Sequence, residues 1–214
     1  MGRSRDESSS RSRAEGKELT RRAIVRAALK LLARNSFDSI SLREVTREAG
    51  ISPTAFYRHF DDMEELGLVL VEESFASLRT MIRDARADPQ LYEHAIRRSA
   101  EVVVIHVRDH TDHMRFIARE RHGGIRRLRQ AIHRELKLFS DELAVDLAVF
   151  PFVERWPTDD RRMLADLITE TMVATAAELI DAGPADEQAI VDRAVRQLTL
   201  ISLGSSIWDP DRPS

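Results

Sequence analysis

Apolar residues recur every three or four positions along most of this 214-residue chain. That interval is typical of amphipathic α-helices. The first segment with the pattern predicts a helix from about Leu19 to Asn35, preceded by a polar stretch. Its apolar face is formed by Ile24, Ala27, Ala28, Leu31 and Leu32.

A second, short helix is predicted to begin after Ser41. Glu44 follows Ser41 by three residues, so the two side chains can cap the start of this helix reciprocally. Leu42, Val45 and Ala49 recur at helical spacing and are expected on its inner face.

A third helix is predicted within "ISPTAFYRHF". Gly50 supplies the turn before it, Ser52 suits the N-cap, and Pro53 suits the first helical position. Phe56 and Phe60 lie four residues apart and can anchor the helix to a core. Most of its other side chains are then left on the open side.

Beyond Phe60, longer amphipathic segments predict a body of about six helices. The first starts at an acidic cap, another opens at Pro89, and a long one follows the sequence "RHGG". The last two run over about 158–182 and 186–208. A loop rich in proline and aromatic residues, "FPFVERWP", precedes them.

Charge is distributed unevenly along this pattern. Residues 1–60 contain 13 Lys/Arg and 7 Asp/Glu (net +6), which leaves 20 and 29 (net −9) for residues 61–214. A basic N-terminal quarter on an acidic body indicates a polyanionic partner for that quarter. The Ser-rich residues 1–16 are expected to be a flexible, solvated tail, because they cannot bury apolar area.

Composition narrows the class of protein further. The chain has no cysteine, which excludes disulfides, thiolate nucleophiles and cysteine-based metal sites, and fits a reducing cytoplasm. Nowhere does an apolar run reach the roughly 18 residues of a membrane span. The sequence therefore predicts an all-α cytoplasmic protein without a membrane partner.

Two short helices joined by a glycine-containing turn form a helix-turn-helix, which lays its second helix in the major groove of DNA. A short helix with a polar outer face contributes little to a core but suits a groove. The alternative is an ordinary helical corner, since such patterns also arise by chance.

The segment "SISLREVTREAGISPTAFYRHFDDMEEL" resembles the DNA-binding motif of the TetR family of transcriptional regulators. Further segments, "FIARERHGG", "AIHRELKLFSDELAVDLA" and "RQLTLISLGSSIW", resemble the FabR and DesT branch, which represses genes of unsaturated fatty-acid synthesis.

The resemblance implies a TetR-like fold, with a three-helix DNA-binding head and a ligand-binding and dimerisation body. It divides the chain into a tail (1–16), a head (17–62) and a body (63–214). The implied partners are double-stranded operator DNA, a second copy of the chain, and a hydrophobic effector. For this branch the effector is a long-chain acyl-CoA whose unsaturation is sensed; no cofactor is implied.

The resemblance also assigns DNA contacts. Tyr57 and His59 match the family's phosphate-holding positions. Arg43 and Thr54 are expected to read bases, because arginine binds guanine bidentately and threonine offers a methyl group to thymine. Arg58 either contacts a phosphate or pairs with a neighbouring aspartate. The candidate DNA-binding residues are Ser41, Arg43, Ser52, Thr54, Ala55, Tyr57, Arg58 and His59.

A fatty acyl chain would need an apolar tunnel between helices of the body. Each apolar candidate for its lining could equally be plain core. Arginines near the glycine pair could hold CoA phosphates; alternatively, Arg119 and Glu120 form a buried ion pair that couples body to head. The candidate ligand-binding residues are Phe75, Leu78, Val103, Val107, Phe116, Arg119, Arg121, Leu128, Ile132, Phe139, Ile168 and Met172, with Leu164 and Arg126 as further possibilities.

Three histidines, His106, His110 and His113, follow helical spacing. One helical face with these residues could bind zinc. A break in the pattern before Thr111 argues against one continuous face, so no metal site is predicted.

Small residues among apolar ones in the last two helices permit close helix approach. Together with the resemblance, this favours a four-helix bundle shared by two chains, over helices that only complete the monomer core. The candidate interface residues are Ala176, Leu179, Val195, Leu198, Ile201, Ser205 and Trp208.

Two other functions compete with that of an acyl-CoA-responsive repressor. A TetR-type regulator of another hydrophobic ligand, such as a drug or metabolite, would share the same features. An enzyme is disfavoured, because the sequence has no phosphate-binding glycine loop, no nucleophile elbow and no placed pair of carboxylates.

Overall fold

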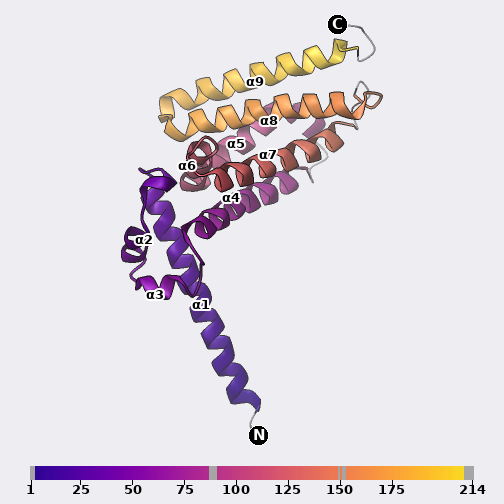
Figure 1. Cartoon of the computed structure of the whole chain (residues 1–214). Helices are drawn as coiled ribbons and strands as arrows, with labels where there is room; N and C mark the ends of the chain where they lie inside the picture. Colours follow the sequence, from indigo (N-terminus) through magenta and orange to yellow (C-terminus); the bar gives the residue numbers. More distant parts are fainter. Residues whose placement is uncertain (1–2, 87–90, 149, 151–152, 210–214) are drawn as a thin grey trace.

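The computed structural model describes residues 3–86, 91–148, 150 and 153–209, and these residues are entirely helical or irregular. Three helices form the head and six the body among these residues, as predicted (Figure 1). The elements are α1 (Arg3–Leu32), the 3₁₀ turn η1 (Phe37–Ser39), α2 (Leu42–Glu48), α3 (Pro53–Phe56), α4 (Met63–Arg86), α5 (Leu91–Asp109), α6 (Thr111–Glu120), α7 (Arg126–Leu147), α8 (Thr158–Asp181) and α9 (Pro184–Ile207).

Helix α1 begins at Arg3, much earlier than the expected start near Leu19. Arginine, glutamate, alanine and lysine in this stretch are good helix formers, so the backbone can continue the helix without an apolar face. Figure 1 shows this N-terminal portion of α1 projecting away from α2 and α3.

The caps that the sequence indicated delimit α2 and α3. The Ser41 backbone N–H donates to Glu44 Oε2 at 2.8 Å, and the Glu44 N–H donates to Ser41 Oγ at 3.3 Å. Gly50 adopts a φ of +68°, the left-handed conformation that glycine tolerates best. The Ala55 N–H donates to Ser52 Oγ at 3.2 Å.

A single apolar cluster joins the head to the body. Phe56 and Phe60 are buried in it, with ring centroids 5.4 Å apart. The same cluster continues through Phe37 and Leu66 to Phe116 on α6 and further residues of α7. The head is therefore packed as a continuation of the body's core.

Helix α4 passes very close to that cluster at Gly67. A β-carbon there would lie 2.8 Å from Cδ2 of Leu128 and 2.9 Å from Cζ of Phe37. Only a residue without a side chain allows α4 to approach both groups.

Two smaller clusters complete the body. One packs α5 against α8 and α9, and the other packs Val153 and Trp156 of the predicted aromatic loop against Leu164 of α8. Helices α8 and α9 lie on the side of the body away from the head (Figure 1). No helix in the described residues is long and apolar enough to cross a membrane.

Candidate nucleic-acid interface

Helix α3 presents one polar side to solvent, because Phe56 packs its single turn against the apolar cluster. The Phe56 side chain is fully buried, whereas Thr54 and Arg58 are exposed and Tyr57 is 58% exposed. Ala55 is half-buried. On α2, Arg43 is exposed beside this side of the head. The structure thus leaves Arg43, Thr54, Tyr57 and Arg58 accessible.

Ser41 and Ser52 are exposed, but both hydroxyls act as caps of their own helices. Ser41 Oγ also donates to Glu44 Oε2 at 2.7 Å. The Glu44 carboxylate is stabilised by these bonds to Ser41, which lower its pKa. What these helix starts offer an anion is therefore chiefly backbone N–H groups.

His59 lies beside three cations. It is half-buried, and its buried Nδ1 has no hydrogen-bond partner among the residues that the structure describes. Burial lowers its pKa from 6.5, and the positive charges of Lys17, Arg21 and Arg58 lower it further. A neutral imidazole therefore sits in a region of positive potential, which is where a phosphate would be attracted.

Arg58 does not form the aspartate pair that was one of its two predicted roles. Among the described residues no ion pair joins it to Asp61 or Asp62. Asp62 Oδ1 instead accepts the Glu65 N–H at 2.7 Å as the cap of α4. The Arg58 side chain is exposed, as is that of Tyr57.

The predicted ligand residues do not converge on one tunnel. Phe75, Phe116, Leu128, Ile132 and Phe139 are buried in the cluster shared with the head, and Leu78 packs against it. Val103 and Val107 belong to the α5–α8–α9 cluster, and Leu164 and Ile168 to the third. Met172 is half-buried on α8. Apart from Met172, each of these positions packs within its own cluster.

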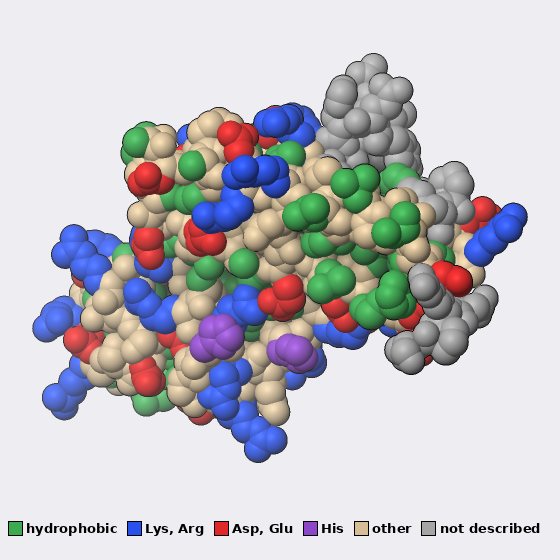
Figure 2. Space-filling view, turned by 90° about the horizontal axis from the view of Figure 1, so that it is seen from above, with side chains coloured by type: hydrophobic (Ala, Val, Ile, Leu, Met, Phe, Trp, Pro, Cys, Tyr) green, Lys and Arg blue, Asp and Glu red, His purple; other side chains and the backbone are tan. Residues whose placement is uncertain are grey.

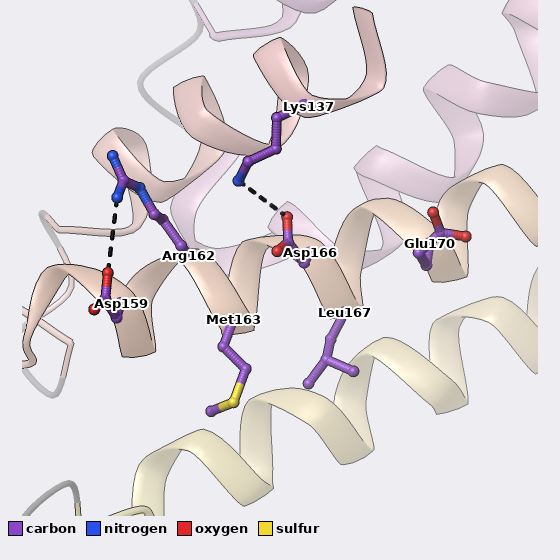
Figure 3. Close-up of a pocket in the computed structure, with 7 residues that line it drawn as sticks. All are labelled: Lys137, Asp159, Arg162, Met163, Asp166, Leu167 and Glu170. Atoms are coloured by element: carbon purple, nitrogen blue, oxygen red, sulfur yellow. Dashed lines mark ion pairs between the residues drawn. The ribbon is translucent and has the colours of Figure 1, made fainter. Parts of the chain in front are cut away.

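A hollow of about 430 Å³ lies elsewhere, on the outside of α7 and α8 (Figure 3). None of the predicted ligand residues lines it. Met163 and Leu167 point toward α9, while Lys137 reaches Asp166 at 3.8 Å and Arg162 reaches Asp159 at 3.7 Å. Glu170 completes the lining.

The arginines proposed to hold CoA phosphates are engaged with the chain itself. Arg119 Nη1 donates to the carbonyl oxygens of Leu32, at 3.1 Å, and Asn35. Arg121 Nη2 donates to Glu170 Oε2 at 3.0 Å. Arg126 is exposed at the start of α7. Neither Arg119 nor Arg121 therefore faces an open anion site.

The predicted ion pair between Arg119 and Glu120 is also replaced by other contacts. Glu120 is 1% exposed, and its Oε1 accepts the backbone N–H of Phe37 at 2.8 Å. Nothing local in the sequence signals this contact, because its partners lie 83 positions apart.

The three histidines gather across the break between α5 and α6. Ring centroids lie 4.7 Å apart for His106 and His110, and 6.1 Å apart for His110 and His113. His106 is 3% exposed, and its Nε2 has no hydrogen-bond partner in the described part of the chain. In the described residues no group of three or more such side chains is arranged to hold a metal ion.

Most of the predicted dimer residues lie on sides of α8 and α9 that are buried in the single chain. Ala176, Leu179, Leu198 and Ser205 are buried within the chain, because this side packs on α5 and between the two helices. Val195 is half-buried against the α5–α8–α9 cluster and Ile201 against the cluster that contains Leu164; of the predicted residues only Trp208 is exposed.

A further apolar stripe is exposed on these helices; of its residues only Trp208 was predicted at the interface, although the others recur at intervals of three, four and seven. We call it the outer stripe; its residues are Met163, Leu167, Leu200, Leu203, Ile207 and Trp208.

Comparisons with known proteins give one family match and several similar folds. Residues 24–68 match the family described as bacterial regulatory proteins, tetR family. The fatty acid degradation regulator FadR from Bacillus halodurans has a similar structure, at 16% identity over 84% of this chain and 94% of that one, with a TM-score of 0.69.

Two further solved structures have the same fold. FadR from Bacillus subtilis, in complex with stearoyl-CoA, matches at 17% identity over 87% of this chain and 98% of that one, with a TM-score of 0.65. NalD, the secondary repressor of the MexAB-OprM multidrug efflux pump in Pseudomonas aeruginosa, matches at 18% identity over 86% and 97%, with a TM-score of 0.63. Residues 24–68 thus match the tetR family, and the chain as a whole has a TetR-like fold.

Proposed function

We propose that this protein is a ligand-responsive transcriptional repressor that binds operator DNA as a homodimer and senses a long-chain acyl-CoA. The observation that carries the proposal is the head: a single-turn α3, anchored by buried Phe56, presents Thr54, Tyr57 and Arg58 outward. This surface lies within the segment that matches the tetR family.

On DNA, the residues of the head would divide into two roles. The N-termini of α2 and α3, with Tyr57, Arg58 and His59, would hold phosphates and fix the orientation of the head. Arg43 and Thr54 would reach base edges and so choose the sequence. Removing Arg43 should therefore relax sequence preference, whereas removing Tyr57 should weaken binding to all sequences alike.

Two heads are needed because one helix-turn-helix contacts too little DNA for operator-level specificity. The outer stripe supports dimerisation, since Leu200 is 70% and Ile207 85% exposed in the single chain. Figure 2, which views the molecule from above α9, shows hydrophobic side chains spread over that face. A symmetric bundle of α8 and α9 from two chains would cover them.

The acyl-CoA proposal draws support from the apolar body and from the fold shared with FadR, one structure of which contains stearoyl-CoA. In the described state the candidate lining residues are packed, so an acyl chain would have to enter between clusters and push them apart. The packed body and the ligand-bound body would then be two alternative states of the protein, and ligand binding would shift the population toward the second. A body that repacks in this way would also move its contacts with the head.

The second candidate is a regulator of another hydrophobic ligand, such as a drug. NalD, a repressor of a multidrug efflux pump, shares this fold equally well. In either case the chain would act by binding and not by catalysis. Mass spectrometry of ligand copurified with the protein separates the two candidates.

The proposal is tested by fluorescence anisotropy on labelled DNA from upstream of the protein's own and neighbouring genes, titrated with stearoyl-CoA and oleoyl-CoA at fixed salt. We expect opposite shifts in operator affinity with the two acyl chains. Specific binding that neither compound changes would retain the repressor and exclude the acyl-CoA effector. Absence of sequence-specific binding would exclude the repressor.

A further inference from the structure

One end of α6 is tied to the head by directional polar contacts. Glu120 Oε1 accepts the N–H of Phe37 at 2.8 Å, and Arg119 donates to the carbonyls of Leu32 and Asn35. These groups occupy the segment between α1 and η1. Two adjacent side chains thus hold both the end of α1 and the start of the next turn.

The Glu120 carboxylate is buried, and among the described residues only its Oε1 has a hydrogen-bond partner. It is 1% exposed, and a β-carbon on Gly123 would lie only 2.2 Å from Oε2. Beside it, the rings of Phe37 and Phe116 pack with centroids 6.1 Å apart. A buried carboxylate that makes a hydrogen bond has a strong preference for one geometry, because losing the bond leaves its charge uncompensated.

The other side of α6 is tied to α8. Arg121 pairs with Glu170 at 3.0 Å, and Arg115 reaches both the carbonyl of Ile180, at 3.3 Å, and the carboxylate of Asp181, at 3.6 Å. Helix α6 therefore has polar bonds to the head at its C-terminal end and to α8 along its length.

The hydrophobic effect is non-directional, whereas these hydrogen bonds have a defined geometry and so add a directional constraint to the apolar packing between head and body. We propose that Arg119 and Glu120 are positioning residues, a head latch, that hold the head at one orientation on the body. If the chain dimerises and binds operators as proposed above, the head latch also sets the separation of the two recognition helices.

The orientation can be measured within one protomer. The chain contains no cysteine, so Arg47→Cys on α2 and Arg134→Cys on α7, both at exposed positions, give two specific spin-label sites. Pulsed electron–electron double resonance then reports the distribution of distances between the two labels, one on the head and one on the body. The labelled protein is diluted into unlabelled protein so that only distances within one protomer are measured. The measurement requires neither DNA nor effector, so its result is independent of the proposed function.

We expect Glu120→Ala and Arg119→Ala each to broaden this distribution at least twofold. Glu120→Gln should keep the narrow distribution, because its amide oxygen can still accept the Phe37 N–H. Arg121→Ala is the matched control, since it removes a polar contact from the same end of α6 that leads to α8.

A distribution in Glu120→Ala and Arg119→Ala as narrow as in the parent protein would overturn the proposal. Equal broadening in Arg121→Ala would overturn it as well, because loss of any polar contact at this end of α6 would then broaden the distance distribution. Arg119 is exposed, so Arg119→Ala should fold even if Glu120→Ala does not, and circular dichroism checks this.

Discussion

His106 is an imidazole buried beside two others, and its protonation should be linked to unfolding. Burial first, then the neighbouring His110 and His113, lower its pKa from 6.5 to about 4. As pH falls below 6.5 the unfolded chain takes up a proton that the folded chain refuses. Between pH 6.5 and about 4 the free energy of unfolding should therefore fall by about 1.4 kcal/mol per pH unit on this account.

Urea denaturation at several pH values, on the parent protein and on His106→Leu, measures that contribution. The stability of the variant should fall less steeply with falling pH than that of the parent protein. Some pH dependence should persist, because burial also lowers the pKa of His113. Parallel stability curves for the two proteins would show that His106 titrates as it does in water.

His59 should behave differently, because its pKa should change when DNA binds. In the free protein, burial and the charges of Lys17, Arg21 and Arg58 lower that pKa. A phosphate beside these cations would favour the charged imidazole and raise it. We expect operator affinity to increase as pH falls from about 8 to 6, with much less increase in His59→Gln; anisotropy titrations measure both slopes, and equal slopes would contradict the phosphate role.

Among the helices, α4 depends most sharply on one position. In Gly67→Ala the new methyl group would overlap buried Leu128 and Phe37, so we expect a loss of about 1–3 kcal/mol in unfolding free energy. Gly16→Ala is the control, because nothing lies within 4 Å of a β-carbon there. Thermal denaturation should show a lower midpoint for the first variant and no loss for the second.

Local signals in the sequence predicted the helices well, but not their faces. The Ser41–Glu44 cap and the Gly50 turn are made by neighbours in the chain, so their pattern suffices to place α2 and α3. By contrast, α8 and α9 carry apolar residues on more than one side, and only tertiary packing decides that Leu198 is buried and Leu200 exposed. The contact of Glu120 with Phe37 depends on the tertiary arrangement alone.

For the whole molecule, the outer stripe makes a direct prediction about assembly. Leu203→Glu would place a charge in the proposed interface between two chains, where it could not be hydrated. We expect sedimentation velocity to show a monomer for this variant and a dimer for the parent protein. Leu19→Glu, at an exposed leucine of α1, should remain dimeric.

The apolar cluster shared by head and body bears on how such a protein can be divided. Phe37 of the head and Leu128 of α7 belong to one apolar cluster and both lie against Gly67 of α4. Residues 1–62 expressed alone would therefore expose much of their own core to water. We expect that fragment to be unfolded by circular dichroism; a cooperative melting transition would contradict this.

On this expectation the head would not be a portable module. A chimera that grafts this head onto the body of a relative would need the α4 and α6 surfaces transplanted with it.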